Sequence, residues 1–166
     1  MQTNEVVEKV AGKLALHHAP TTGMLLVKIG RAAERWYTEA LRPLGLTPRH
    51  LGVLLEVQAR PTSQQALIDS IGVDPSKLVG LLNDLEAEGL IVRRRDPEDR
   101  RRHIVEVSKL GRTRLEAAEQ AAAEVEDRLF AGIDAEQRAE LLGVLAQVAD
   151  RSGILEGCVD LLARPD

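Results

Sequence analysis

The chain has 166 residues, of which 44% are hydrophobic and only 2% are aromatic. The hydrophobic share excludes a disordered polymer, and the length is sufficient for one domain with its own core. The aromatic residues, Trp36, Tyr37 and Phe130, are too few for the stacking platforms that bind single-stranded nucleic acid. Among nucleic acids, duplex DNA is therefore the better match.

Cys158 is the only cysteine, which excludes an intramolecular disulfide. The N-terminal stretch, residues 2–16, mixes polar and apolar side chains and has no signal-peptide pattern. No apolar run approaches the roughly 20 residues of a membrane span. These features predict a cytoplasmic protein with no membrane partner.

Charge is unevenly distributed along the chain, although the formal net charge is −4. Residues 115–166 carry 4 basic and 12 acidic side chains, whereas residues 93–114 carry 9 basic and 4 acidic ones. A local positive patch, rather than the global charge, attracts an anionic polymer such as DNA. This patch is concentrated in residues 93–103, which contain six arginines.

The N-terminal part is predicted to be helical. Residues 1–18 have apolar positions at helical spacing and indicate a short amphipathic arm, and residues 22–42 indicate a longer helix that ends at Pro43. Thr47 and Pro48 then have the residue types of an N-cap and a first helical position. The buried stripe of the helix that follows is expected to consist of Leu51, Leu54 and Leu55.

Residues 63–88 indicate two short helices joined by a tight turn. Ser63 is placed to cap a helix over 64–71, and Asp74 precedes a second helix over 75–88. The second helix repeats leucines at the spacing i, i+3, i+4, i+7, which defines an inward face. These leucines are Leu78, Leu81, Leu82 and Leu85. A helix-turn-helix of this kind places its second helix in the DNA major groove.

A β-hairpin is predicted directly after these helices. The apolar runs 90–92 and 104–105, rich in β-branched residues, flank a turn that contains Pro97. A helix-turn-helix followed by a basic hairpin is a winged helix, so we predict a mainly α fold with a small β-hairpin wing. The alternative is that this charged run is a solvated loop, because acidic residues are interleaved with its arginines.

The whole chain, 1–166, is predicted to form a single domain, because no repeat or clear linker interrupts it. Residues 45–110 are enough for a winged-helix DNA-binding lobe. The apolar stripes of the remaining helices, in 1–42 and 109–166, exceed what so small a lobe can cover and are expected to dimerise. The elements expected after the hairpin are helices over 109–131 and 134–150 and an apolar piece over 154–162.

The side chains opposite the leucine face are candidates for base contact. They are Ser76, Lys77, Gly80 and Asn83. Lys77 can donate to guanine, and Gly80 lets the helix lie close to the bases. Ser63 and Gln64 are candidates for phosphate contact, although Ser63 can also be a simple cap. The hairpin adds Arg95, Arg100, Arg101 and Arg102.

Five segments carry a more specific pattern. They are 45–50 (GLTPRH), 73–79 (VDPSKLV), 85–91 (LEAEGLI), 96–102 (DPEDRRR) and 107–111 (VSKLG). Through these segments the chain resembles the MarR-type winged-helix transcription regulators over about residues 22–150. The wing segment is the most specific part of the match. Val107 and Ser108 stand where Leu and Thr are usual, which is a departure from the family.

The resemblance implies a repressor that binds as a homodimer to a pseudo-palindromic operator in double-stranded DNA. It places the helix over 75–88 in the major groove and the wing in the flanking minor groove. By position, Arg101 matches the wing-tip arginine and Asp99 the acid that orients it. An arginine in a narrow, A·T-rich minor groove gains from the negative potential there.

The resemblance also implies release by a small effector, such as an aromatic acid bound between the dimerisation helices and the DNA-binding lobe. The candidate ligand-binding residues are Trp36, Tyr37 and His50, which can stack and form hydrogen bonds. The alternative for Trp36 is a plain core position, and His50 stands where the family usually has Gln. Oxidant-sensing relatives keep their cysteine near the start of the chain, so Cys158 does not predict thiol sensing.

Two other classes of function remain open. A winged helix can serve protein interaction instead of DNA binding, although the basic wing argues against this. An enzyme is not indicated, because no nucleophile–base pair, Gly-rich phosphate loop or Cys/His metal spacing is present, and no cofactor is predicted. His17 and His18 are not expected to hold a metal, because adjacent side chains on a helix point apart.

Overall fold

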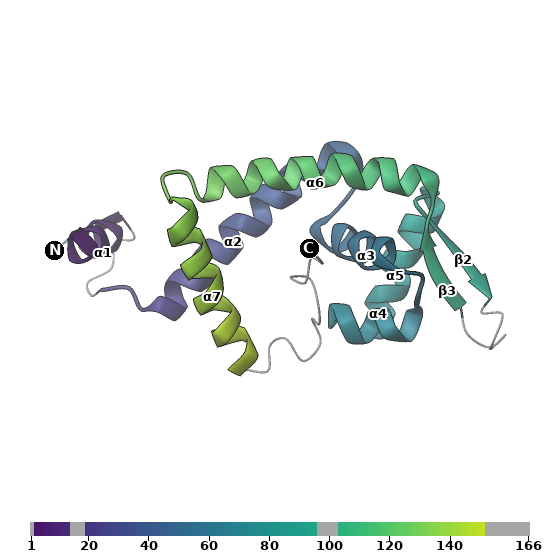
Figure 1. The fold of residues 1–166 in the computed structure, drawn as a ribbon, viewed down its shortest axis with the longest axis horizontal. Coiled ribbons are helices and arrows are strands. Elements are labelled where there is room, and N and C mark those ends of the chain that lie inside the picture. Colours follow the sequence, from purple (N-terminus) through teal and green to yellow (C-terminus); the bar gives the residue numbers. More distant parts are fainter. Residues whose placement is uncertain (1, 14–18, 96–102, 152–166) are drawn as a thin grey trace. The chain divides into compact units, whose positions relative to one another are not determined.

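The computed structural model describes residues 2–13, 19–95 and 103–151. Contacts within the chain divide it into two units, residues 1–36 and 37–166. Figure 1 shows the helices and strands of the chain. Several residues of interest lie outside the described residues: Asp99, Arg100, Arg101, Arg102, His17, His18, Cys158 and the apolar piece 154–162.

The first unit is helical. α1 spans Gln2–Lys13, and α2 spans Thr22–Leu41 and crosses the division between the units. The bounds of α2 agree with the helix predicted over 22–42. α1 lies within the arm predicted over 1–18, of which residues 1 and 14–18 are outside the described residues. Four apolar side chains on these helices stay exposed, namely Val6, Leu26, Val27 and Ile29. They show that the apolar stripes of α1 and α2 are not fully covered within the unit.

The short helices of the second unit begin where the sequence supplies caps. These helices are α3 (Pro48–Ala59), α4 (Gln64–Ile71) and α5 (Pro75–Ala87). The side-chain oxygens of Thr47, Ser63 and Asp74 each accept a hydrogen bond from a backbone N–H of the first turn. Each cap therefore satisfies a donor that the start of a helix leaves without a partner, as predicted from the sequence.

The hairpin is part of a three-stranded antiparallel sheet. Its strands are β1 (Thr62–Ser63), β2 (Ile91–Arg95) and β3 (His103–Val107), in the order β1-β3-β2. The hairpin itself confirms the prediction. β1 was not predicted, because two residues are too short to show the alternation that identifies a strand. In the central strand, Val105 lies opposite Thr62 on one side and Arg93 on the other.

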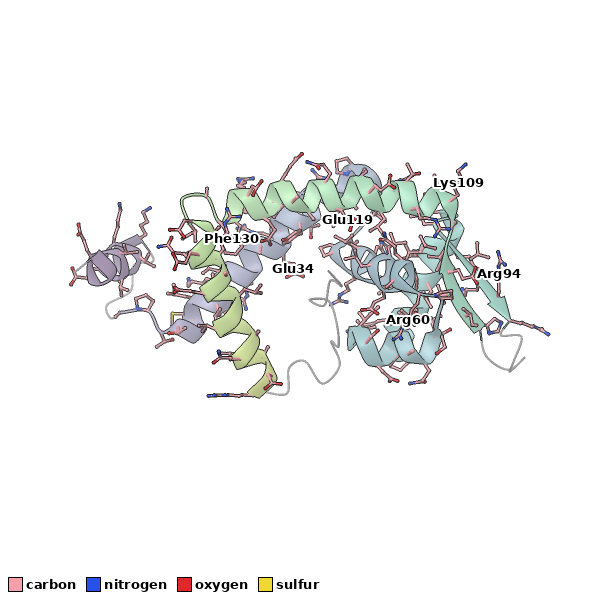
Figure 2. The ribbon with its side chains drawn as sticks, in the orientation of Figure 1. Glu34, Arg60, Arg94, Lys109, Glu119 and Phe130 are labelled. Atoms are coloured by element: carbon pink, nitrogen blue, oxygen red, sulfur yellow. The ribbon has the colours of Figure 1, made fainter. Side chains whose placement is uncertain are left out.

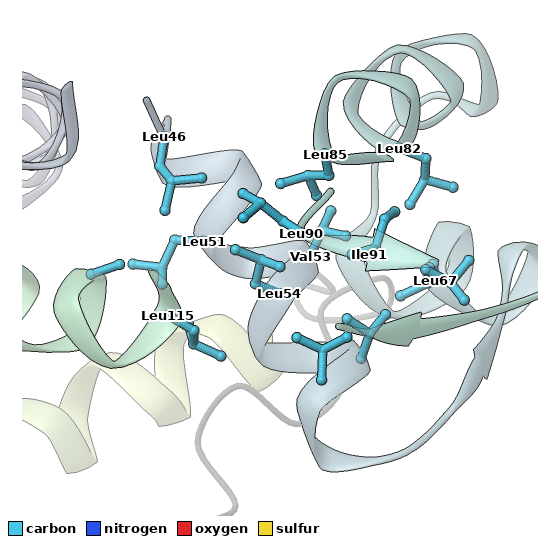
Figure 3. Close-up of a cluster of buried hydrophobic side chains, with 14 of the residues drawn as sticks. Leu46, Leu51, Val53, Leu54, Leu67, Leu82, Leu85, Leu90, Ile91 and Leu115 are labelled. Atoms are coloured by element: carbon cyan, nitrogen blue, oxygen red, sulfur yellow. The ribbon is translucent and has the colours of Figure 1, made fainter. Parts of the chain in front are cut away.

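Leucine, isoleucine and valine side chains form the core, which surrounds α3 (Figure 3). α3 contacts α4, α5, α6 and β3, so it connects the helices to the sheet. The largest fully buried side chains are Leu41, Val53, Leu54, Leu67, Leu78, Leu82, Leu85, Leu90, Ile91, Val105 and Leu115. Leu55 and Leu81, which were expected inside, are only partly buried and pack against the edge of this core. The predicted inward faces were therefore slightly too wide.

Two longer helices follow the sheet. They are α6 (Lys109–Leu129) and α7 (Ala135–Arg151), and the short 3-10 helix η1 (Arg42–Leu44) joins α2 to α3. α7 has no buried residue, and its side chains Leu141, Leu142, Val144 and Val148 are exposed. Among the residues that the structure describes, no helix combines the length and the apolar character needed to cross a membrane.

The start of α6 lies against the segment that joins α5 to β2. The Ser108 hydroxyl accepts from the Gly111 backbone N–H at 2.9 Å and donates to the Gly89 carbonyl at 2.7 Å. The Ser108 backbone N–H also donates to the Leu90 carbonyl at 2.9 Å. A Cβ atom on Gly111 would lie 2.0 Å from the Leu90 carbonyl oxygen, so this close approach requires glycine.

We expect Gly111→Ala to lower the free energy of unfolding by about 3 kcal/mol or more, because a backbone carbonyl cannot move aside as a flexible side chain can. Urea unfolding measures the change. The matched control is Gly52→Ala in α3, where no heavy atom lies within 4 Å of the added methyl group. That variant should be neutral or stabilised by up to about 1 kcal/mol. Equal stability of the Gly111→Ala and Gly52→Ala proteins would contradict the packing described above.

Candidate nucleic-acid interface

α5 presents an exposed, mostly polar face opposite its buried leucines. Ser76, Lys77, Gly80 and Asn83 are all exposed, whereas Leu78, Leu82 and Leu85 are buried. This is the orientation predicted from the leucine spacing. When such a helix enters the DNA major groove, the residues of its N-terminal half reach the base edges. Ser76, Lys77 and Gly80 lie in this half of α5, whereas Asn83 lies nearer its C-terminus.

The N-terminus of α5 is organised by Asp74. Its carboxylate accepts hydrogen bonds from both the backbone N–H and the hydroxyl of Ser76. Both bonds lower the pKa of Asp74 below its usual value, and the bond from the hydroxyl has the larger effect. The Ser76 hydroxyl is therefore oriented by the cap, and its oxygen keeps lone pairs that can accept from a base.

Arg93 joins the hairpin to α5. Its guanidinium donates to the side-chain carbonyl of Asn83 and forms an ion pair with Glu86 at 2.9 Å. The Arg93 side chain is only 19% exposed, whereas that of Arg94 is 68% exposed. Sequence reasoning counted Asn83 as a base contact and missed its bond to Arg93. The available signal was strand alternation, which puts Arg93 on the same face of β2 as the buried Ile91.

The next two arginines lie further along β2. Arg94 lies 3.6 Å from the Glu106 carboxylate on β3, and Figure 2 shows it on the hairpin. Arg95, at the end of β2, is exposed and pairs with His103 across the hairpin. Arg95 therefore lies at the limit of the described hairpin, immediately before the segment that contains the other candidate wing residues.

The candidate phosphate contacts lie at the start of α4. Ser63 and Gln64 are partly exposed, and the Ser63 hydroxyl accepts from the Ala66 backbone N–H at 3.2 Å. Both residues line an open cavity of about 600 Å³, together with His103 of β3. The first turn of a helix has backbone N–H groups without helical partners, which suit an anion. Ser63 is thus a cap in a position where contact with an anion is also possible.

Two of the candidate ligand-binding residues already have polar partners. The Tyr37 hydroxyl donates to the Glu126 carboxylate. The pKa of Tyr37 is raised, mainly by burial and to a smaller extent by this bond and by the carboxylate charge. His50 Nδ1 accepts from the Thr47 backbone N–H at 3.3 Å, so the neutral ring carries its proton on Nε2. Nε2 lies 3.7 Å from the Asp84 carboxylate of α5, which is too far for a hydrogen bond.

Trp36, the third candidate, is the last residue of the first unit and is partly exposed. Trp36 therefore belongs to the first unit, whereas Tyr37 and His50 belong to the second. In the described ranges 2–13, 19–95 and 103–151, no group of three His, Cys, Asp or Glu side chains is placed to hold a metal ion.

Comparison with known proteins identifies the family. Residues 44–102, which include α3, the helix-turn-helix and β2, match the model of the MarR family. A putative transcriptional regulatory protein for the hcr operon of Thauera aromatica is 35% identical over 105 residues. That match covers 63% of this chain and 63% of the relative's length.

Solved structures extend the similarity over more of the chain. A MarR-family transcriptional regulator from Rhodococcus sp. RHA1 is 32% identical, with a TM-score of 0.70, over 76% of this chain and 91% of the regulator. The chain belongs to the MarR family of transcriptional regulators. The repressor CouR, solved with a 23-mer DNA duplex, is 33% identical over 78% of this chain and 92% of CouR, with a TM-score of 0.74.

CouR of Rhodococcus jostii RHA1 has also been solved with p-coumaroyl-CoA. In that complex it is 29% identical to this MarR-family chain, with a TM-score of 0.65, over 87% of this chain and 94% of CouR. The mainly α fold with a winged helix is therefore shared with regulators whose structures include both a DNA complex and a ligand complex.

His50 makes the stability of this MarR-family chain depend on pH. Burial lowers the pKa of His50 from its ordinary value, and the Asp84 carboxylate only partly offsets this effect. The unfolded chain therefore binds the proton more readily than the folded chain does. It follows that the stability present above pH ~6.5 decreases as the pH falls through the unfolded and then the folded pKa.

We expect the free energy of unfolding of the wild type to fall more steeply than that of His50→Gln between about pH 8 and about pH 5.5. Glutamine at this third helical position can still accept from the Thr47 N–H but does not titrate. Urea unfolding at each pH measures the difference between the two proteins. Parallel stability profiles would show that His50 does not titrate differently in the folded and unfolded states.

Proposed function

We propose that this MarR-family chain is a homodimeric repressor that binds a pseudo-palindromic operator in double-stranded DNA. The observation that carries the proposal is the pairing of α5 with the hairpin. α5 exposes a mostly polar face, and Arg93 holds the arginine-rich strand β2 beside it. As a regulator of gene expression the protein would act in the cytoplasm, and we assign it no catalytic activity and no cofactor.

In this proposal α5 enters the major groove, and Ser76, Lys77 and Gly80 lie closest to the base edges. Ser63 and Gln64 contact a phosphate from the start of α4. The wing enters the flanking minor groove through Arg95, Arg100, Arg101 and Arg102, with Asp99 orienting Arg101. The CouR complex with duplex DNA supports this assignment, because CouR shares the fold over most of both chains.

The proposed homodimer rests on apolar side chains that each unit leaves uncovered. In the first unit they include Val27 and Ile29, which are 54% and 49% exposed, and in the second Leu142 and Val144, which are 53% and 57% exposed. These positions lie on helices outside the winged helix, where a second copy can bury them without blocking α5. A twofold-symmetric dimer would then read two half-sites of an inverted repeat.

We further propose that a small aromatic ligand releases the DNA, with Trp36, Tyr37 and His50 near the ligand. The solved complex of CouR with p-coumaroyl-CoA supports a ligand with an aromatic acyl group. Because Tyr37 and His50 each have a protein partner, a ligand would have to compete with the Glu126 and Thr47 contacts for their polar atoms.

A titration of aromatic carboxylic acids, followed by the fluorescence of the single tryptophan and by operator binding, tests this release. We expect both signals to change over the same concentration range, because the ligand must favour an arrangement with weaker DNA affinity. Tyr37→Phe, which removes only the hydroxyl, should shift the ligand concentration required. Unchanged fluorescence and unchanged operator binding at about millimolar acid, the weak end of specific binding, would exclude an effector of this class.

Selection of bound sequences from a random pool of duplex DNA tests the proposed function itself. We expect an inverted repeat whose half-sites are separated by about one helical turn, roughly 34 Å, because two α5 helices of a dimer must reach the same face of the duplex. A·T-rich positions should appear where the wing enters the minor groove, and Arg101→Ala should weaken that preference. Recovery of no consensus would favour the alternative of a winged helix used for protein interaction.

A further inference from the structure

Val79 is the large apolar side chain that α5 leaves exposed. It is 38% exposed and lies in the N-terminal half of the helix, where its neighbours Lys77 and Gly80 are exposed as well. The leucines of α5 turn toward the core, and Val79 does not join them. An apolar group at this place faces whatever lies in front of α5.

Val79 lies on the same side of α5 as the two residues that Arg93 binds. Val79, Asn83 and Glu86 follow one another at the spacing i, i+4, i+7, so they form one stripe along α5. Arg93 binds Asn83 and Glu86, and Val79 extends the stripe by one turn toward the N-terminus. The turn that contains Val79 is therefore the part of the stripe that approaches the base edges.

Asn83 is poorly placed to read a base itself. A bidentate contact with adenine requires both the carbonyl oxygen and the amino group of the side chain, in one plane with the base. The carbonyl oxygen of Asn83 already accepts from Arg93, which sets the orientation of the amide. In this stripe, Val79 is therefore better placed than Asn83 to contact a base.

Gly80 provides an independent observation. A Cβ atom on Gly80 would meet no heavy atom within 4 Å, so the packing of the chain does not require glycine there. Glycine in a helix interior is unfavourable, and β-branched valine is less favourable than alanine or lysine. Gly80 and the exposed Val79 are thus adjacent residues that weaken the helix, and packing within the chain does not account for the glycine. Close approach of another molecule accounts for it.

We propose that Val79 is a specificity-determining residue that contacts the C5 methyl group of a thymine in the major groove. The proposal rests on the proposed function as an operator-binding protein and extends it to one base and one side chain. The thymine methyl is the apolar group that a base pair presents in the major groove, and cytosine has only hydrogen at the same carbon. Gly80 lets the helix backbone come close enough for the short valine side chain to reach it.

Methyl deletion on both partners tests the proposal. In the operator selected by the wild type, each thymine is replaced in turn by uracil, which removes the C5 methyl group and keeps all hydrogen-bonding groups. We expect one such replacement in each half-site to weaken binding roughly three- to fivefold, the effect of exposing about one methyl group. In Val79→Ala the same replacement should have no effect, because the two partners form a single contact. Fluorescence anisotropy of labelled duplexes measures each affinity.

Val92→Ala is the matched control, because Val92 is 40% exposed but lies on β2 rather than on α5. This variant should keep the full sensitivity to uracil. Alanine at position 79 favours the helix, so loss of folding is not expected to obscure the result. Two results would overturn the proposed role of Val79 while leaving the proposed function in place. One is an operator whose affinity is insensitive to every uracil replacement, and the other is equal sensitivity in the wild type and Val79→Ala. Failure to select any operator would overturn the proposed function and, with it, this role.

Discussion

The arrangement of the candidate interface depends on the contact between Arg93 and α5. β1 pairs only with Ile104 and Val105 of the hairpin, so the direction of the rest of the hairpin must be fixed by packing on the fold. Ile91 provides the apolar part of that packing. Two residues further along β2, on the same face, Arg93 binds Asn83 and Glu86. Because Glu86 is 44% exposed, the ion pair adds little stability, but it defines where the hairpin lies relative to α5.

Acidic partners on the protein offset part of the positive charge of the hairpin. Six arginines lie within residues 93–103, yet Arg93 is paired with Glu86 and Arg94 faces Glu106. Of the described arginines in this segment, Arg95 is the one at the far end of β2. The positive charge that Arg93 and Arg94 add at the base of the hairpin is therefore partly offset by Glu86 and Glu106.

Local chemistry explains why most of the fold was predictable from the sequence. Thr47, Ser63 and Asp74 cap their helices through bonds to residues two or three positions away, so a short window contains the information. The exposed side of α5 followed from its leucine spacing in the same way. The bond between Arg93 and Asn83, in contrast, joins two elements, and the two-residue strand β1 exists only because β3 lies beside it. Neither has a periodic signal in its own segment.

α5 is contacted on both sides by side chains from other elements, and this limits how a ligand can act. His50 of α3 faces Asp84, while Arg93 of β2 holds the adjacent residue, Asn83. His50 and Arg93 therefore approach neighbouring positions of α5 from two different elements. A ligand alters DNA affinity only if it favours one of two arrangements that bind DNA differently. If α5 and the hairpin move as one body, the two arrangements of the proposed dimer differ in the spacing between its lobes.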